Sequence, residues 1–364
     1  MNFIDLQRQY KMYKEEIDAE IQKVLDSSAY VFGAQIKELE EKLSDYCGID
    51  HAIACASGTD ALLLAIMALE LKPGDEIITT PFTFIATAEI PALFGIKPVF
   101  VDIDADTYNI NPDLIENAIT EKTKAIITVD IFGQIADMKK IEQIAKKHSL
   151  FIIEDAAQSF GAIQNNAKAC SFGDISTTSF FPAKPLGCYG DGGMVFTKNQ
   201  ELAQKIISLR NHGQGEKYQH KYIGVNARLD TIQAAVLLVK FKYYENEISL
   251  RQEKAAYYNK ELKDFITVPK IKENNRSVYA QYSIQSGQRE KITAAFQKNK
   301  IPFAIHYPIP LHLQPCFNYL GYKQGDFPVA EELSNRIMSS PMFAQINDDE
   351  QKLVTGTIIE AVNS

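Results

Sequence analysis

Two kinds of segment alternate along the first 210 positions of the chain. Short β-branched apolar runs indicate buried strands, and apolar residues at helical spacing indicate amphipathic helices. The pattern predicts strands at Ile53–Ala56, Glu76–Thr80, 98–102, 125–129, 151–155, 175–181 and 193–197. It predicts helices at 11–27, 35–47, Thr59–Leu71, 84–94, 112–119, 137–148 and 199–210. This alternation favours an α/β fold with a largely parallel sheet, which binds ligands at the carboxyl ends of its strands.

The pattern changes after residue 210. A polar loop at 211–226 precedes a helical pattern at 230–262, which is long enough to bridge to a second domain. The rest indicates a smaller α+β unit, with a strand near 278–285, a loop at 302–316, and helices at 289–299, 328–338 and 348–362. We therefore expect a large domain at 1–240 and a small domain at 241–364.

Composition narrows the class of protein. The chain has 364 residues, 46% of them hydrophobic, which is enough for a sizeable core. A net charge of -8 argues against a nucleic-acid partner. Five scattered cysteines without a CxxC pair are typical of reduced thiols. The start of the chain does not resemble a signal peptide, and no apolar run is long enough to span a membrane, so we expect a cytoplasmic protein without a membrane partner.

Lys184 has the most unusual surroundings in the sequence. It ends the run Ser179-Phe180-Phe181-Pro182-Ala183-Lys184 and is followed by the turn Gly190-Asp191-Gly192-Gly193. An isolated lysine is usually a surface residue, but this flank predicts a partly dry site. Desolvation lowers a lysine pKa, and a neutral amine is a nucleophile and a base. The glycines do not fit a dinucleotide fingerprint, because a strand follows them instead of a helix.

A second candidate site residue is Asp155, at the end of the apolar run Phe151–Glu154. A buried carboxylate needs a cation or strong donors, and a protonated pyridine nitrogen is such a cation. The alternative is a strand-end carboxylate that caps the next turn. Ala157 is small enough to lie flat against a ring, and Gln158 can hydrogen-bond a ring hydroxyl.

Ser57-Gly58-Thr59 joins a predicted strand to a predicted helix. The first turn of a helix exposes N–H groups, and glycine lets a phosphate approach them. A simple helix N-cap is the alternative. Ser179 can add a hydroxyl to the same phosphate. Phe84, just past a strand, can stack on a ring or belong to the core. No histidine pair has metal-ligand spacing, so no metal is expected.

These segments together resemble the DegT/StrS family of pyridoxal-phosphate sugar aminotransferases, which have the aspartate-aminotransferase (type I) fold. The resemblance is carried by Ala56–Leu62, Pro73–Glu76, Thr80–Thr87, Glu154–Ser159 and Phe180–Gly193. It implies a mostly parallel seven-stranded sheet in the large domain and a smaller C-terminal α+β domain.

The resemblance also implies residue roles. Lys184 matches the lysine that binds pyridoxal 5'-phosphate covalently, Asp155 the partner of the pyridine nitrogen, and Gln158 the neighbour of the ring hydroxyl. Gly58, Thr59 and Ser179 match phosphate contacts. Asn226 matches an asparagine that reaches the phosphate from the other subunit, which implies a homodimer with shared active sites.

Within the family, the stretches PFTFIATAE and TSFFPAKPLGCYGDGG are most similar to enzymes acting on UDP-2-acetamido-2-deoxy-3-keto-glucuronate for bacterial surface polysaccharide. Arg228 would then bind the sugar carboxylate or that of the donor, glutamate. His306, Tyr307 and His312 would line the sugar side.

Three alternatives stay open. One is an aminotransferase for a dTDP-linked 3- or 4-keto-6-deoxy sugar. Another is a sugar dehydratase of the same fold, in which histidine replaces the lysine. The third is a non-catalytic regulator, against which intact Lys184, Asp155 and Gln158 argue.

Overall fold

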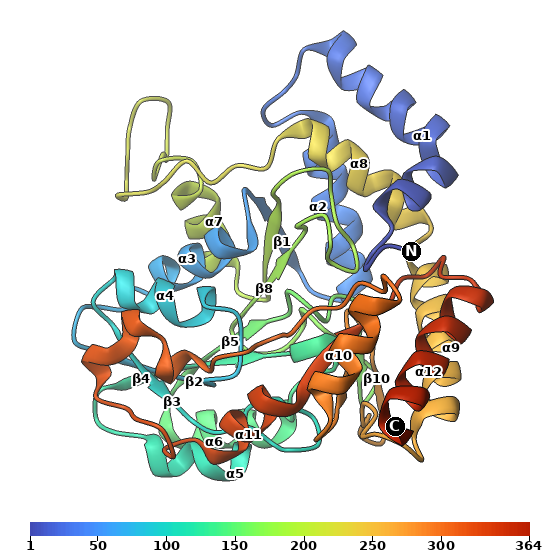
Figure 1. Cartoon of the computed structure of the whole chain (residues 1–364). Coiled ribbons are helices and arrows are strands. Elements are labelled where there is room, and N and C mark those ends of the chain that lie inside the picture. The colour runs from blue at the N-terminus through green and yellow to red at the C-terminus, as the bar shows by residue number, and fades with distance from the viewer.

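A seven-stranded sheet forms the centre of the computed structural model, which describes residues 1–364 (Figure 1). Its strands lie in the order β1 (His51–Cys55), β9 (Gly193–Thr197), β8 (Ile175–Ser179), β5 (Phe151–Asp155), β4 (Thr123–Val129), β2 (Glu76–Thr79) and β3 (Lys97–Phe100). β9 is antiparallel to both of its neighbours, and every other pairing is parallel. All strands except β9 therefore end at the same edge of the sheet, as the α/β pattern predicted.

Helices cover both faces of this sheet. Successive residues of β5 point to opposite faces, with Ile152 in one core cluster and Ile153 in the other. The first cluster includes residues of α2 (Ala34–Cys47), α6 (Met138–His148) and α8 (Thr231–Lys242). The second includes residues of α3 (Gly58–Ala68), α4 (Ala86–Leu93) and α7 (Gln200–Leu209). Near-continuous apolar strands are expected for a sheet buried on both sides.

The long helical pattern at 230–262 forms two consecutive helices. α8 ends at Lys242, and α9 begins at Tyr244 and ends at Leu262. Tyr243 lies between the two helices and belongs to neither, with φ -103° and ψ -2°. Its ring stacks on Tyr13 of α1 (Leu6–Ser27), with centroids 4.2 Å apart. The break between α8 and α9 therefore coincides with a contact to the distant helix α1, and the local hydrophobic periodicity does not indicate it.

The C-terminal part has its own apolar cluster. It joins α9 to β11 (Tyr282–Gln285), α10 (Arg289–Lys298), β12 (Ile337–Ser340) and α12 (Asp348–Asn363). The predicted helix at 328–338 ends at Arg336 in α11 (Pro328–Arg336), and the next residues form β12, which pairs with β11. Residues 311–337 pack instead on the large sheet, where Asp102 accepts hydrogen bonds from the N–H groups of Val329 and Ala330. A division into domains at residue 240 stays a prediction.

The remaining elements are short. They are α5 (Pro112–Ile115), β6 (Ile163–Gln164), β7 (Ala167–Lys168), β10 (Asn275–Arg276), η1 (Glu116–Ala118), η2 (Ile131–Gly133), η3 (Leu311–Leu313) and η4 (Pro315–Leu320). The sequence pattern did not predict β6, β7 or β10, because two-residue strands have no periodicity. Among the helices, none has the length and hydrophobicity that a membrane span requires.

Candidate active site

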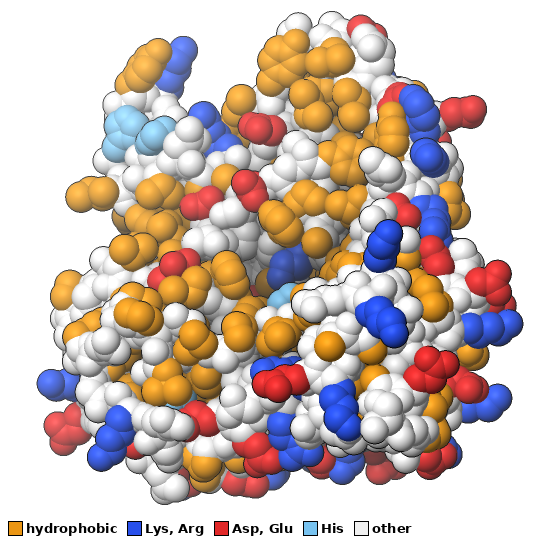
Figure 2. Space-filling model, viewed as in Figure 1, with side chains coloured by type: hydrophobic (Ala, Val, Ile, Leu, Met, Phe, Trp, Pro, Cys, Tyr) orange, Lys and Arg blue, Asp and Glu red, His pale blue; other side chains and the backbone are white.

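A cavity of about 620 Å³ lies where β1, β5 and β8 end. The space-filling view shows a hollow near the middle of one face, with basic side chains in its depth and apolar ones around it (Figure 2). Residues that line the cavity come from the loops after the strands, the N-terminal segment and the C-terminal part. Those predicted from the sequence are Ser57, Gly58, Thr59, Phe84, Asp155, Ala157, Gln158, Ser179, Lys184, His306 and Tyr307.

Lys184 is half-buried and its amine faces the cavity. Its Nζ makes no hydrogen bond or ion pair within the chain, whereas its backbone N–H donates to Phe181 O at 2.8 Å. Burial lowers the pKa of Lys184, and the nearby charge of Asp155 acts in the opposite direction. An anchored backbone with a free amine of lowered pKa suits a nucleophile and base.

Asp155 is buried at the end of β5. Its Oδ1 accepts from the N–H of Ala157 at 3.1 Å, and its Oδ2 accepts from the hydroxyl of Thr87 at 3.2 Å. Burial raises the pKa of Asp155, although these two donors and the charge of Lys184 oppose the rise. No cation lies within ion-pair distance of this carboxylate, so it is poised to pair with a cationic ligand group.

Gln158 has a fixed amide. Its Oε1 accepts from the N–H of Phe132 at 2.8 Å, which directs its Nε2 toward Tyr307 Oη at 3.3 Å. Burial raises the pKa of Tyr307, whose ring contacts Phe82 edge-on. The amide N–H₂ of Gln158 is therefore held as a donor at the wall of the cavity.

The phosphate-site residues meet at the start of α3. The N-cap interpretation is correct for Ser57, whose Oγ accepts from the N–H of Asp60 at 3.0 Å. The N–H groups of Gly58 and Thr59 have no acceptor inside the helix and remain available to an anion. A Cβ on Gly58 would lie 2.6 Å from the Cβ of Ser179, so only glycine lets the end of β8 approach this closely.

Phe84 and His306 lie at other walls of the cavity. The Phe84 side chain is 55% exposed, so it is not the core residue that was the alternative. His306 Nδ1 is 3.1 Å from Ser339 Oγ, and its ring lies 6.2 Å from that of Phe3. Burial, and then the charge of Lys184, lower the pKa of His306.

Three predicted residues do not line the cavity of their own chain. Asn226 is exposed, and Arg228 lies over the ring of Phe32 at 5.9 Å. His312 is buried, with Nε2 3.0 Å from Glu331 Oε1. A side chain without exposed surface cannot contact a ligand, so the expected sugar contact of His312 is not supported.

Several residues that line or support the cavity have no signal, or only a weak one, in the sequence. Thr87 donates to Asp155 Oδ2, and its place in the predicted helix at 84–94, just after a strand, was the available signal. Phe3 and Ile4 from the N-terminal segment and Gln281 from the C-terminal part also line the cavity. Nothing in their local sequence marks them, because tertiary packing brings them there.

This set of side chains fits pyridoxal phosphate. The free amine of Lys184 suits an aldehyde, the buried Asp155 suits a protonated ring nitrogen, and the start of α3 suits a phosphate. No group of three or more His, Cys, Asp or Glu side chains is arranged to hold a metal ion.

Comparison with known proteins gives full-length relatives. The chain is 47% identical to UDP-2-acetamido-2-deoxy-3-oxo-D-glucuronate aminotransferase of Pseudomonas aeruginosa, over 98% of this chain and 99% of that one. It is 44% identical to a pleiotropic regulatory protein of Geobacillus stearothermophilus, over 98% of this chain and 97% of that one. It is 42% identical to UDP-N-acetyl-3-dehydro-alpha-D-glucosamine 3-aminotransferase of Acidithiobacillus ferrooxidans, over 95% of this chain and 94% of that one.

Solved structures agree with the predicted fold. An aminotransferase from Brucella abortus is 45% identical, with a TM-score of 0.97 and full coverage of both chains. NtdA of Bacillus subtilis with bound cofactor PMP is 30% identical, with a TM-score of 0.93, covering 100% of this chain and 85% of that one. The expected type I fold, the pyridoxal-phosphate cofactor and the aminotransferase activity are confirmed. The DegT/DnrJ/EryC1/StrS aminotransferase family profile matches residues 11–359, and the chain belongs to this family.

Proposed function

We propose that this enzyme transfers an amino group from glutamate to C3 of a UDP-linked 3-keto sugar, and that its substrate is UDP-2-acetamido-2-deoxy-3-keto-D-glucuronate. The product would serve bacterial surface polysaccharide synthesis in the cytoplasm. The observation that carries the proposal is Lys184 beside Asp155 in one cavity, in a chain 47% identical to a relative named for that sugar. The relative at 42% is named for a UDP-linked 3-dehydro sugar without the acid.

Each side chain at the site would have a distinct role in the reaction. The cofactor supplies the aldehyde that takes the amino group and a ring that withdraws electrons from the reacting carbon. The Lys184 amine removes the proton from the α-carbon of glutamate and later returns a proton to C3 of the sugar. Asp155 keeps the ring nitrogen protonated, and Thr87 and the Ala157 N–H hold its carboxylate in place. The N–H groups of Gly58 and Thr59, with Ser179, bind the phosphate.

A carboxylate on either substrate needs a cation. Lys184 and His306 are the basic side chains that line the cavity of a single chain, and neither is an arginine. Arg228 of a second copy would supply the guanidinium, and Asn226 of that copy would reach the phosphate. The region around these residues presents unusually exposed apolar side chains, with Tyr218 at 82% and Ile223 at 93%. Figure 2 shows apolar side chains over the upper part of the molecule, as a buried dimer contact would require.

A substrate panel tests the proposed sugar. Purified enzyme with glutamate would receive the 3-keto glucuronate, the same UDP sugar without the C6 carboxylate, and a dTDP-linked keto-6-deoxy sugar. Mass and NMR analysis should find the highest kcat/KM with the acid, and amination at C3. Arg228→Ala should lower kcat/KM for the acid by about tenfold to a hundredfold, the loss expected for a charge-assisted pair. If the dTDP sugar reacts best, the substrate assignment is wrong.

A mixing experiment tests the shared active site. Lys184→Ala and Arg228→Ala subunits, each impaired alone, would be unfolded and refolded together. If Arg228 acts across the interface, each mixed dimer has one intact site, and a statistical mixture should recover about a quarter of wild-type activity. If Arg228 acts within its own chain, each site of a mixed dimer lacks one of the two residues, and mixing should recover nothing.

A further inference from the structure

Two buried serines connect His306 to the interior of the C-terminal part. Ser283 of β11 and Ser339 of β12 are directly paired in the small sheet, and their Oγ atoms are 2.9 Å apart. The 304–306 segment lies beside β12, because Ala304 and Ser339 exchange both backbone hydrogen bonds. This arrangement brings His306 Nδ1 to 3.1 Å from Ser339 Oγ. The result is a continuous chain from Ser283 through Ser339 to His306.

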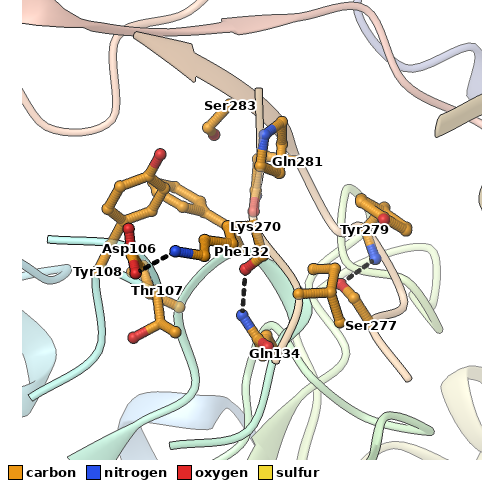
Figure 3. Close-up of a pocket in the computed structure, with 13 residues that line it drawn as sticks. Asp106, Thr107, Tyr108, Phe132, Gln134, Lys270, Ser277, Tyr279, Gln281 and Ser283 are labelled. Atoms are coloured by element: carbon orange, nitrogen blue, oxygen red, sulfur yellow. Dashed lines mark hydrogen bonds and ion pairs between the residues drawn. The ribbon is translucent and has the colours of Figure 1, made fainter. Parts of the chain in front are cut away.

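The far end of this chain lies at a second, much smaller cavity of about 20 Å³ (Figure 3). Ser283 and Gln281 line it above the ion pair between Lys270 and Asp106, whose Nζ–Oδ2 distance is 2.6 Å. Ser283 Oγ has no hydrogen-bond partner among these side chains, and Gln281 Oε1 is buried without a partner. Within the chain, Ser339 is therefore the only acceptor for the Ser283 hydrogen.

The direction of the hydrogen bonds follows from this. If Ser339 donated to Ser283, the Ser283 hydrogen would have no acceptor in the chain and could be satisfied only by a water in the small cavity. If Ser283 donates to Ser339, and Ser339 donates to His306 Nδ1, both hydroxyl hydrogens are satisfied. Nδ1 of His306 must then carry no proton, and the imidazole proton is on Nε2.

We propose that Ser283 and Ser339 are positioning residues that hold His306 in the neutral tautomer with its proton on Nε2, so that His306 donates a hydrogen bond to an oxygen of the keto sugar. This inference rests on the proposed function, because it gives His306 a role toward the sugar. Nε2 has no partner in the chain, and His306 lines the large cavity beside Lys184. A neutral donor suits a keto or hydroxyl oxygen near the reacting carbon and leaves carboxylate binding to Arg228.

The charged surroundings of His306 favour the neutral ring. Lys184 faces it across the cavity, and a second cation there would be repelled. Phe3 contacts it from the N-terminal segment and carries no charge. β12 places the Ser339 hydroxyl against the imidazole, and the ring of Tyr307, whose hydroxyl is kept neutral by burial, lies 5.7 Å away. Asp155 and Asp191 lie on other walls of the same cavity.

Nitrogen NMR of the purified holoenzyme tests this directly. Long-range ¹H–¹⁵N spectra of histidine-labelled protein distinguish the two tautomers and follow the imidazole pKa, and His306→Gln identifies its signal among six histidines. Wild type should show the Nε2–H form. Ser339→Ala removes a donor that favours the neutral ring, so the pKa of His306 should rise by roughly half a unit to one unit. Ser283→Ala should cause a smaller rise.

Ser340→Ala is the matched control. Ser340 is a buried neighbour on β12 whose Oγ has no hydrogen-bond partner, so its loss should leave the His306 signal unchanged. Ser339→Ala should also raise KM for the keto sugar by about threefold to tenfold while the half-reaction with glutamate stays near wild type. Ser339→Thr, which keeps the hydroxyl, should restore both values.

An Nδ1–H tautomer in wild type, or a pKa that falls or stays constant in Ser339→Ala, would overturn the inference. The tautomer is read from the wild-type spectrum alone, so the inference can be tested even if a variant fails to fold. Failure of the proposed function would look different, because wild type would then aminate no keto sugar whatever the tautomer of His306.

Discussion

Two lysines of this enzyme, Lys184 and Lys240, meet at the loop between β8 and β9 and differ in what surrounds their amines: Lys184 belongs to this loop, and Lys240 donates a hydrogen bond to it. Lys184 Nζ has no acceptor in the chain and faces the cavity. Lys240 of α8 is only 3% exposed, and its Nζ donates to the carbonyl of Gly187 and lies 5.5 Å from the Tyr189 ring centroid. Burial lowers the pKa of both.

The contrast shows that a lowered lysine pKa does not by itself identify a catalytic group. A buried amine that is hydrogen-bonded to the backbone supports structure, whereas one that opens on a cavity beside a carboxylate can react. Lys240 donates to Gly187 in the loop that contains Lys184, so it supports the position of Lys184. Substitutions at and around each lysine should separate chemistry from support.

The largest effect is expected at Lys184. Lys184→Ala removes the nucleophile and base, so turnover should fall by about 10³-fold or more. The wild type should absorb as a covalently bound cofactor and be trapped by borohydride, which mass spectrometry would locate on Lys184. If Lys184→Ala still forms the trapped adduct and turns over, Lys184 is not the catalytic lysine, and the proposed difference between Lys184 and Lys240 is wrong.

Asp155 is the carboxylate that faces Lys184. Asp155→Asn keeps the shape but cannot pair with a protonated ring nitrogen, and turnover should fall by about 10²-fold to 10³-fold. Thr87→Val is the matched control, because it removes only the hydroxyl that donates to Oδ2. A loss below about tenfold is expected for it. Equal losses in the two variants would mean that the position of the carboxylate matters more than its charge.

Much of this site could be predicted from the sequence. Lys184, Asp155 and Gly58 each follow a short apolar run, and parallel strands bring such ends to one edge of a sheet. The features that the sequence did not predict depend on contacts between residues far apart in the chain. Tyr243 breaks the 230–262 pattern where it stacks on Tyr13, and Glu331 pairs with His312 inside the protein. Local spacing carries no information about either contact.

Lys240 should affect stability more than chemistry. Lys240→Met keeps the apolar stem but leaves the buried Gly187 carbonyl without its donor, which should cost about 1–3 kcal/mol of unfolding free energy. Turnover should fall less than about tenfold. Lys242→Met, on the same helix, removes an exposed lysine paired with Glu16 and should change stability by no more than about 0.5 kcal/mol. Urea unfolding and kcat measure these effects, and a large loss of kcat without destabilisation would make Lys240 catalytic.

Lys240 also contributes a pH dependence of stability. Burial lowers the pKa of Lys240 from 10.5 to about 8 in the folded protein. Between those values the unfolded chain keeps this proton and the folded chain has lost it, so the unfolded state binds more protons and stability from this group rises with pH. Wild type should therefore gain stability relative to Lys240→Met between about pH 8 and 10.5, as measured by urea unfolding of both proteins. If the stability difference between the two proteins stays constant over this pH range, the Gly187 hydrogen bond keeps Lys240 charged. The pKa of the buried Lys240 would then not differ from that of an exposed lysine.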